Sequence, residues 1–167
     1  PDVIRQGTGE HQNPMDTRLR TKEEACYTIK MNRLALSFYP LLYPAVYCML
    51  QKAEKSKLKN KEKQAALSHQ LQTDVLPFGA CLIFTPLFAE KEEKAFDPET
   101  QFFYEEYILA LRCRRKNYKI VYDPSMTVNH ESGAATKKSY STEKKRIRFM
   151  LEKTAAACEV YLEMLGE

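Results

Sequence analysis

The sequence predicts an α/β fold in which several helices accompany a few-stranded mixed sheet. The run Val75–Leu87 is short, apolar and punctuated by Gly79 and a proline, a pattern typical of a buried strand. Tyr118–Tyr122 is rich in β-forming residues, and after an Asp-Pro turn the chain resumes an extended pattern up to His130. By contrast, Glu143–Leu165 carries apolar residues at helical spacing and predicts a long amphipathic helix.

Two further helical segments are expected earlier in the chain. A helix should begin at Thr21, since Thr21 and Glu24 have the spacing of a capping box. The stretch 51–70 is rich in Lys, Glu, Gln and Ala, which favours a helix with a solvated face. Between them lies Leu34–Leu50, an apolar segment that two prolines interrupt and that is shorter than the roughly 20 residues needed to cross a bilayer. We expect this segment to pack in the core or against another part of the polypeptide. Docking on a membrane surface through its Tyr and Leu side chains is the alternative.

Composition indicates one folded unit spanning residues 1–167. A chain of 167 residues, 44% of them hydrophobic, is long enough for one core and too short for two ordinary domains. The net charge of +4 is modest, and no zinc-finger, RRM or helix-turn-helix signature is present, so no nucleic-acid partner is expected. Phosphorylated sugars and anionic lipid head groups would still suit the lysines. The five cysteines are scattered and odd in number, which favours a reducing compartment over a disulfide framework or a zinc site.

Two adjacent carboxylates and a histidine form a candidate active site. Glu105 and Glu106 are expected near the start of a helix that begins after Asp97-Pro98 or near Thr100. There the helix dipole stabilises a carboxylate, which can be directed at a bound hydroxyl group. His130 ends the strand pair that follows and could contact a metal ion or a phosphate. The alternative is purely structural, because acidic residues early in a helix are ordinary stabilising choices and histidine is a common polar residue at strand ends.

Other residues are candidates for substrate contacts. Gly79 would allow a ligand to approach the backbone closely, although a tight turn or a bulge at a strand start explains it equally well. Ser132–Ser141 holds Lys137 and Lys138 between small residues, as in a loop that folds over a diphosphate and offsets its charge. An exposed loop without function is the alternative. Arg112 opens the basic run at the end of the acidic helix.

Several short motifs, taken in order, resemble family 2 glycosyltransferases of the GT-A fold, in particular bacterial enzymes that build capsular and cell-wall polysaccharides. That family carries a glycine-containing strand, a Phe-Asp segment, an acidic pair opening a helix, an arginine, a Gly-Tyr-Lys-Ile strand and a histidine. The corresponding residues here are Gly79-Ala80-Cys81, Phe96-Asp97, Glu105-Glu106, Arg112, Asn117-Tyr118-Lys119-Ile120 and His130. The segment Gly9–Pro14 is similar to the one that follows the donor-binding half in that family. Two departures are Glu106, where the family more often has Asp, and Asn117, which replaces the glycine.

The resemblance implies a partial GT-A fold, the C-terminal, acceptor-side part of an inverting glycosyltransferase. Such an enzyme transfers a sugar from a nucleotide-diphosphate donor to a carbohydrate or lipid-linked acceptor with the help of a divalent metal, Mn²⁺ or Mg²⁺. The residues it implies are Glu106 as base with Glu105 beside it, Gly79, Arg112, Lys137 and Lys138 at the substrates, and His130 at the metal. The sequence contains no Asp-x-Asp motif and no nucleotide-binding half, so we expect the metal to be held mainly by residues outside this chain. The chain alone is expected to be inactive and to form homo-oligomers.

Two other classes of protein compete with this interpretation. A non-catalytic, basic helical module that docks on a membrane or on a synthase partner would account for the lysines and the apolar segment. A hydrolase that uses Glu105 and Glu106 as acid and base is less favoured, because adjacent residues on a helix point about 100° apart. The glycosyltransferase and the docking module both predict a cytoplasmic location, peripheral to the inner face of the membrane.

Overall fold

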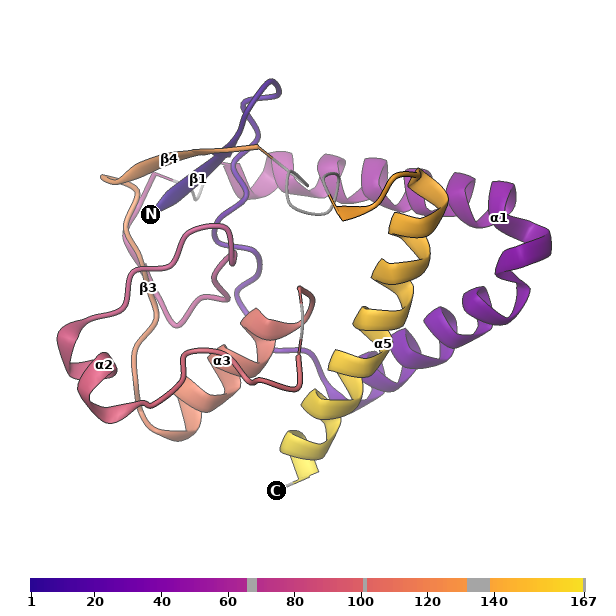
Figure 1. Cartoon of the computed structure of the whole chain (residues 1–167). Coiled ribbons are helices and arrows are strands. Elements are labelled where there is room, and N and C mark those ends of the chain that lie inside the picture. The colour runs from indigo at the N-terminus through magenta and orange to yellow at the C-terminus, as the bar shows by residue number, and fades with distance from the viewer. Residues whose placement is uncertain (66–68, 101, 132–138, 167) are drawn as a thin grey trace.

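The computed structural model describes residues 1–65, 69–100, 102–131 and 139–166, and it has mixed α/β character (Figure 1). The α/β class is therefore confirmed in its coarse form. The expected single mixed sheet is not observed among these residues. Instead, β1 (Asp2–Arg5) pairs in parallel with β4 (Thr127–His130), and β2 (Gln72–Thr73) pairs antiparallel with β3 (Val121–Tyr122) in a separate sheet.

The longest helix, α1 (Lys22–Ala65), begins as expected and then bends. Its capping box is formed, since the Glu24 backbone N–H donates to Thr21 Oγ1 at 3.3 Å and the Thr21 N–H donates to Glu24 Oε2 at 2.9 Å. Half-way along, the helix turns back on itself at one end of the molecule (Figure 1). Pro40 and Pro44 lie in this part of the helix, where each lacks the N–H needed for a helical hydrogen bond. The prolines thus redirect the helix rather than end it.

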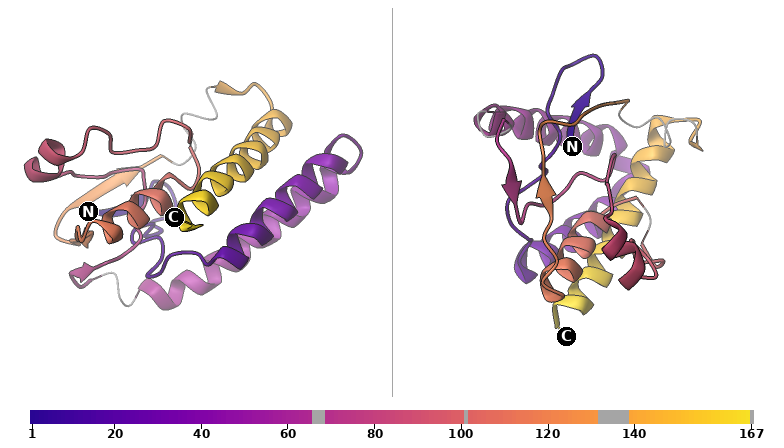
Figure 2. Two further views of the ribbon diagram at one scale, coloured as in Figure 1. Left: turned by 90° about the horizontal axis from the view of Figure 1, so that it is seen from below. Right: turned by 90° about the vertical axis from the view of Figure 1, so that its left-hand side faces the viewer.

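Helix α5 (Glu143–Gly166), predicted from its periodicity, runs alongside the first limb of α1 (Figure 2). Two apolar clusters hold the helices together. The first joins α1, α3 (Glu105–Arg115) and α5, and consists of Ala25, Leu76, Tyr107, Ile108, Ala110, Leu111 and Tyr161. The second lies between the bend of α1 and the start of α5, and consists of Tyr39, Val46, Ile147 and Leu151. Among the described residues, no helix combines the length and apolar character needed to cross a membrane.

The prediction of a buried strand over Val75–Leu87 is wrong. Only Val75, Leu76 and Pro77 are buried, and the chain from Pro77 to Thr85 forms neither strand nor helix. Thr85 then caps a short helix, α2 (Pro86–Lys91), by accepting a hydrogen bond from the Phe88 N–H on its Oγ1 at 3.3 Å. A cap residue followed by proline is a helix-start signal, and here it outweighs the apolar content of the run.

The start of α3 also differs from the expectation. The helix begins at Glu105, several residues after Asp97-Pro98 and Thr100, because Phe102 and Tyr104 adopt left-handed backbone angles with φ of 73° and 63°. Bulky residues rarely adopt this conformation, which is incompatible with a right-handed helix. Consequently, Glu105 and Glu106 occupy the first turn of α3 itself.

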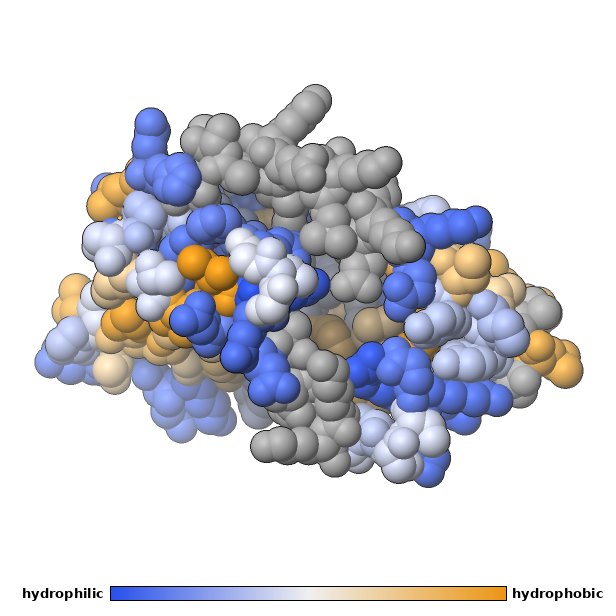
Figure 3. Space-filling model, turned by 90° about the horizontal axis from the view of Figure 1, so that it is seen from above, coloured by the Kyte–Doolittle hydropathy of each residue, from blue (hydrophilic) through white to orange (hydrophobic). Residues whose placement is uncertain are grey.

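Figure 3 shows the surface from above. Apolar side chains reach the solvent at its right-hand end, over the bend of α1.

Candidate functional site

The candidate site forms around the dipeptide Phe78-Gly79, which lies between Glu106 and His130. The chain before this dipeptide is held by the N-terminal segment, since Met15 N–H donates to the Leu76 carbonyl and Leu76 N–H donates to the Asp16 carbonyl, each at 2.8 Å. Asn13 extends this pairing through its side chain and accepts from the Phe78 N–H at 3.0 Å. The Asn13 amide group also donates to the Pro1 carbonyl at 2.7 Å. The backbone of Phe78 and Gly79 is thus fixed by residues far away in sequence.

Gly79 contacts the carboxylate of Glu106 directly. Its N–H donates to Glu106 Oε1 at 3.2 Å. A Cβ atom at position 79 would lie 2.4 Å from the same oxygen, much closer than real Cβ contacts. The φ angle of Gly79 is outside the left-handed region, so the need for glycine here comes from the carboxylate and not from the backbone conformation. The close approach expected at Gly79 is therefore made by Glu106.

Glu106 has the electrostatic character of a candidate base. Burial, the largest influence, raises its pKa above the ordinary value of 4.5, and the charge of Glu105 raises it further. Hydrogen bonds from the backbone N–H groups of Glu106 and Gly79 act in the opposite direction. A half-buried carboxylate with a raised pKa is more basic than one in water, which suits it to accept a proton from a bound hydroxyl.

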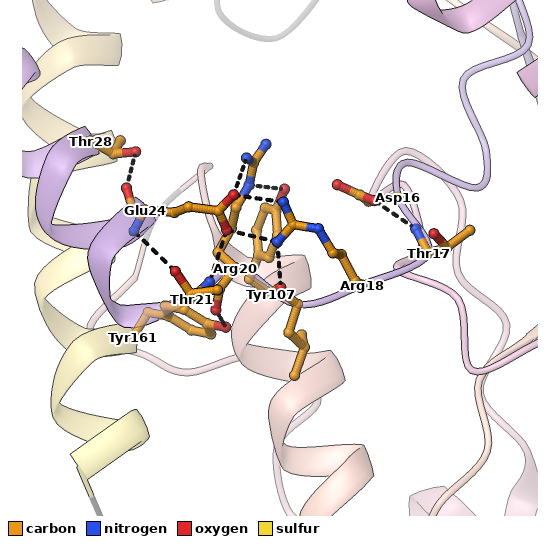
Figure 4. Close-up of polar contacts among 10 residues, drawn as sticks. Asp16, Thr17, Arg18, Arg20, Thr21, Glu24, Thr28, Tyr107 and Tyr161 are labelled. Atoms are coloured by element: carbon orange, nitrogen blue, oxygen red, sulfur yellow. Dashed lines mark hydrogen bonds and ion pairs between the residues drawn. The ribbon is translucent and has the colours of Figure 1, made fainter. Parts of the chain in front are cut away.

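The first turn of α3 is braced from its other side by the segment before α1 (Figure 4). Arg20 Nε donates to the hydroxyl oxygen of Tyr107, the residue after Glu106, at 3.1 Å. The Tyr161 hydroxyl of α5 donates to the Arg20 carbonyl at 2.8 Å. Arg18 forms a two-point ion pair with Glu24, with N–O distances of 2.8 and 2.6 Å. These contacts tie the residues before α1 to α3 and α5, so the turn that carries Glu106 has little freedom to shift.

His130 lies on the other side of the dipeptide. Its ring and the Phe78 ring pack in a T-shaped arrangement at a centroid distance of 5.6 Å, and its Nδ1 lies 2.8 Å from the side-chain amide of Gln12. With the Gln12 nitrogen facing His130, the Gln12 oxygen accepts from Arg5 at 3.2 and 3.3 Å, so this amide orientation satisfies every group. Nδ1 then accepts a hydrogen bond, and the neutral imidazole carries its proton on Nε2. In this tautomer His130 offers a hydrogen-bond donor, which suits a phosphate oxygen better than a metal ion.

Arg112 is part of a different cluster. Its guanidinium group donates to the Glu92 carboxylate at 3.1 Å and to the carbonyls of Ala95 and Lys94 at 3.2 and 3.0 Å. Lys116 Nζ lies 2.7 Å from Glu92, and the Tyr118 hydroxyl donates to the same carboxylate at 3.0 Å. The hydrogen bond from Lys116 is the largest of the influences that lower the pKa of Glu92. Arg112 thus holds the segment after α2 against α3. The predicted binding of a substrate by Arg112 stays a prediction.

Glu105, the two lysines and the metal ion are the other predicted parts of the site. Glu105 precedes Glu106 and is half-buried, and the N–H of Gly79 donates to Glu106. Lys137 and Lys138 lie outside the described residues. Across the described part of the chain, no group of three His, Cys, Asp or Glu side chains could hold a metal ion. The metal therefore stays a prediction.

Sequence reasoning missed the supporting residues of this site. Gln12 and Asn13 belong to the Gly9–Pro14 segment, which was noted only for its resemblance to a family motif. A polar Gln-Asn pair before proline was the available signal, but it did not reveal that Asn13 contacts the Phe78 backbone or that Gln12 contacts His130. Glu92, central to the Arg112 cluster, carried no signal because it sits among other charged residues.

Comparison of the chain with protein-family models, with curated proteins and with solved structures finds no match in any of the three.

Proposed function

We propose that this chain forms the acceptor side of an inverting glycosyltransferase, with Glu106 as the base. The carboxylate accepts the proton of an acceptor hydroxyl while that oxygen attacks the anomeric carbon of a nucleotide-diphosphate sugar. A new carbon–oxygen bond forms, and the bond from the anomeric carbon to the diphosphate breaks with its electron pair leaving on the diphosphate. The class of reaction comes from the family resemblance, and the structure supports the choice of base.

The contact between Glu106 and Gly79 is the observation that carries the proposal. A general base must be held in one position, because small displacements of a catalytic group reduce the rate strongly. Here the position is fixed by a backbone N–H that is itself anchored through Asn13. Burial also makes the carboxylate more basic. A glutamate that only served the helix dipole would need neither the contact nor the burial.

His130 has a secondary role in this proposal. Its Nε2–H would donate to an oxygen of the departing diphosphate and stabilise the charge that develops there. A divalent cation would neutralise more of that charge and would be held mainly by carboxylates from another part of the polypeptide. The acceptor is a carbohydrate or a lipid-linked sugar, as in capsular and cell-wall polysaccharide synthesis.

The test uses the complete polypeptide that contains this chain. Release of nucleoside diphosphate is measured with a panel of nucleotide sugars, Mn²⁺ and candidate acceptors, for wild type, Glu106→Gln and the matched control Glu105→Gln. Glu106→Gln should reduce turnover by about 10²- to 10⁴-fold, the contribution of a positioned base. Glu105→Gln should reduce turnover less. Near-normal turnover of Glu106→Gln would refute the assignment, and the reverse ranking would move the role to Glu105.

A further inference from the structure

The bend of α1 lies at one extremity of the molecule (Figure 1), and apolar side chains reach the solvent there (Figure 3). Leu41 is 84% exposed and Phe38 is 49% exposed, and Tyr47 and Met49 on the second limb are also exposed. Single exposed apolar residues are common, but several gathered on one projection mark an interaction site.

Helix α1 carries no acidic side chain through the bend. From Ala25 to Lys52 the chain contains no aspartate or glutamate, and its charged residues are Lys30, Arg33 and Lys52, of which Arg33 pairs with Glu159 of α5. Lysines of α5 add to this charge, since the Tyr39 hydroxyl on the bend donates to the Lys144 carbonyl at 2.6 Å. Lys144 also places its ammonium group 5.6 Å from the centre of the Tyr43 ring. The exposed Lys144 and Lys145 thus place positive charge beside the apolar projection, while the neighbouring Glu143 is paired with Arg146.

Buried side chains of the bend pack against α5 and hold the projection in place. Tyr39 and Val46 point inward from the bend and pack against Ile147 and Leu151 of α5. The exposed side chains alternate with these buried ones, so the apolar surface is fixed in place without a partner. Insertion of these side chains into a partner surface would then require little ordering of the chain.

We propose that this bend docks on an anionic lipid surface, with Phe38 and Leu41 entering the interface and the lysines contacting lipid head groups. A convex projection with a few apolar side chains suits insertion between lipids. A stable contact with a second copy would need about 800 Å² from each partner, more than a few side chains on a bend supply. Aromatic and lysine side chains beside the projection are also typical of residues at a membrane–water interface.

This inference does not rest on the proposed function, because its test measures no sugar transfer. If both hold, docking would bring the enzyme to acceptors carried by lipids. A failure of vesicle binding would leave the role of Glu106 untouched, and a failure of catalysis would leave docking untouched.

Vesicle sedimentation and light scattering test the proposal. Wild type should bind vesicles of phosphatidylcholine mixed with phosphatidylglycerol, and should bind phosphatidylcholine alone much more weakly. Leu41→Asp should weaken binding by about tenfold or more, since it removes one inserted apolar side chain and adds a negative charge. The matched control is Ile83→Asp, because Ile83 is 65% exposed in the segment before α2, away from the bend. The control should bind like wild type.

Charge reversal tests the two exposed lysines separately. The double variant Lys144→Glu, Lys145→Glu should lose most of the preference for anionic vesicles, since both side chains are exposed. The proposal is overturned if wild type does not bind anionic vesicles, if it binds both vesicle types equally, or if Ile83→Asp weakens binding as much as Leu41→Asp. A dimer in light scattering that Leu41→Asp dissociates, without vesicle binding, would also overturn it and make the bend an interface between copies.

Discussion

Substitution of Gly79 by alanine is the most direct perturbation of the candidate site. The φ angle of this residue suits alanine, so the added methyl group acts only through its surroundings. Its three nearest atoms all belong to Glu106, with Oε1 at 2.4 Å, Cδ at 3.2 Å and Cγ at 3.4 Å. The carboxylate must therefore move away and lose its hydrogen bond to the backbone N–H at position 79.

The expected magnitude follows from these contacts. A lost hydrogen bond costs about 1 kcal/mol in the free energy of unfolding. The side chain of Glu106 is flexible at its end, so its displacement should add at most about 1 kcal/mol. A total of roughly 1–2 kcal/mol corresponds to a fall in Tm of about 2–8 °C for a domain of this size. In the assay of the proposed function, misplacement of Glu106, the proposed base, should reduce turnover by about 10²-fold.

A double-mutant cycle separates this contact from other effects. The free energy of unfolding is measured by urea denaturation for wild type, Gly79→Ala, Glu106→Ala and the double variant. In the Glu106→Ala background the methyl group meets none of the three nearest atoms, so Gly79→Ala should cost little there. The coupling energy should be about 1–2 kcal/mol. Additive effects of the two substitutions would refute the argument that Glu106 is the reason for glycine at this position.

Three other predictions concern ionisable side chains. Because the pKa of Glu106 is raised in the folded state, the folded protein loses stability as pH rises above 4.5, the ordinary pKa of a glutamate. Glu106→Gln should therefore be more stable than wild type at neutral pH and equally stable in acid. Folding lowers the pKa of Glu92, so its carboxylate stabilises the folded protein above pH 4.5, and this stability is lost as pH falls through the pKa of the folded state. Glu92→Gln should therefore be less stable than wild type at neutral pH and equally stable in strong acid. Urea denaturation across pH checks both, and the opposite pH trend would contradict either. His130→Ala should weaken nucleotide-sugar affinity in the complete polypeptide with little change in Tm. A large fall in Tm with unchanged nucleotide-sugar affinity would instead show a structural role.

Local patterns predicted the elements whose stability depends on neighbours in sequence. The capping box at Thr21 depends on residues three apart, and it forms as predicted. The apolar spacing within Glu143–Leu165 predicted α5, and the extended pattern before His130 predicted β4. In α3, Ile108 and Leu111 are buried as their spacing predicted, although the helix starts later than expected.

Features set by contacts between distant residues were not predictable in the same way. The run 75–87 reads as a strand because it is apolar, yet Pro77 lacks an N–H and the Thr85-Pro86 pair starts a helix. Left-handed angles at Phe102 and Tyr104 contradict the preferences of these residues, so only packing elsewhere can impose them. The contact between Gly79 and Glu106 joins residues that no local pattern relates. The sequence could name both residues as candidates, but not their contact.

The adjacent carboxylates at the start of α3 differ in role because they differ in environment. Glu106 meets the backbone of Gly79, whereas Glu105 acts on it through charge and raises its pKa. Glu105→Gln removes that charge and leaves the hydrogen bond, so it should lower the pKa of Glu106, by less than the rise that burial causes. Carbon-detected NMR titration of the Glu106 carboxyl measures this directly, and in the complete polypeptide the acid limb of the pH–rate profile should move to lower pH. An unchanged pKa together with an unchanged limb would mean that Glu105 does not influence the base.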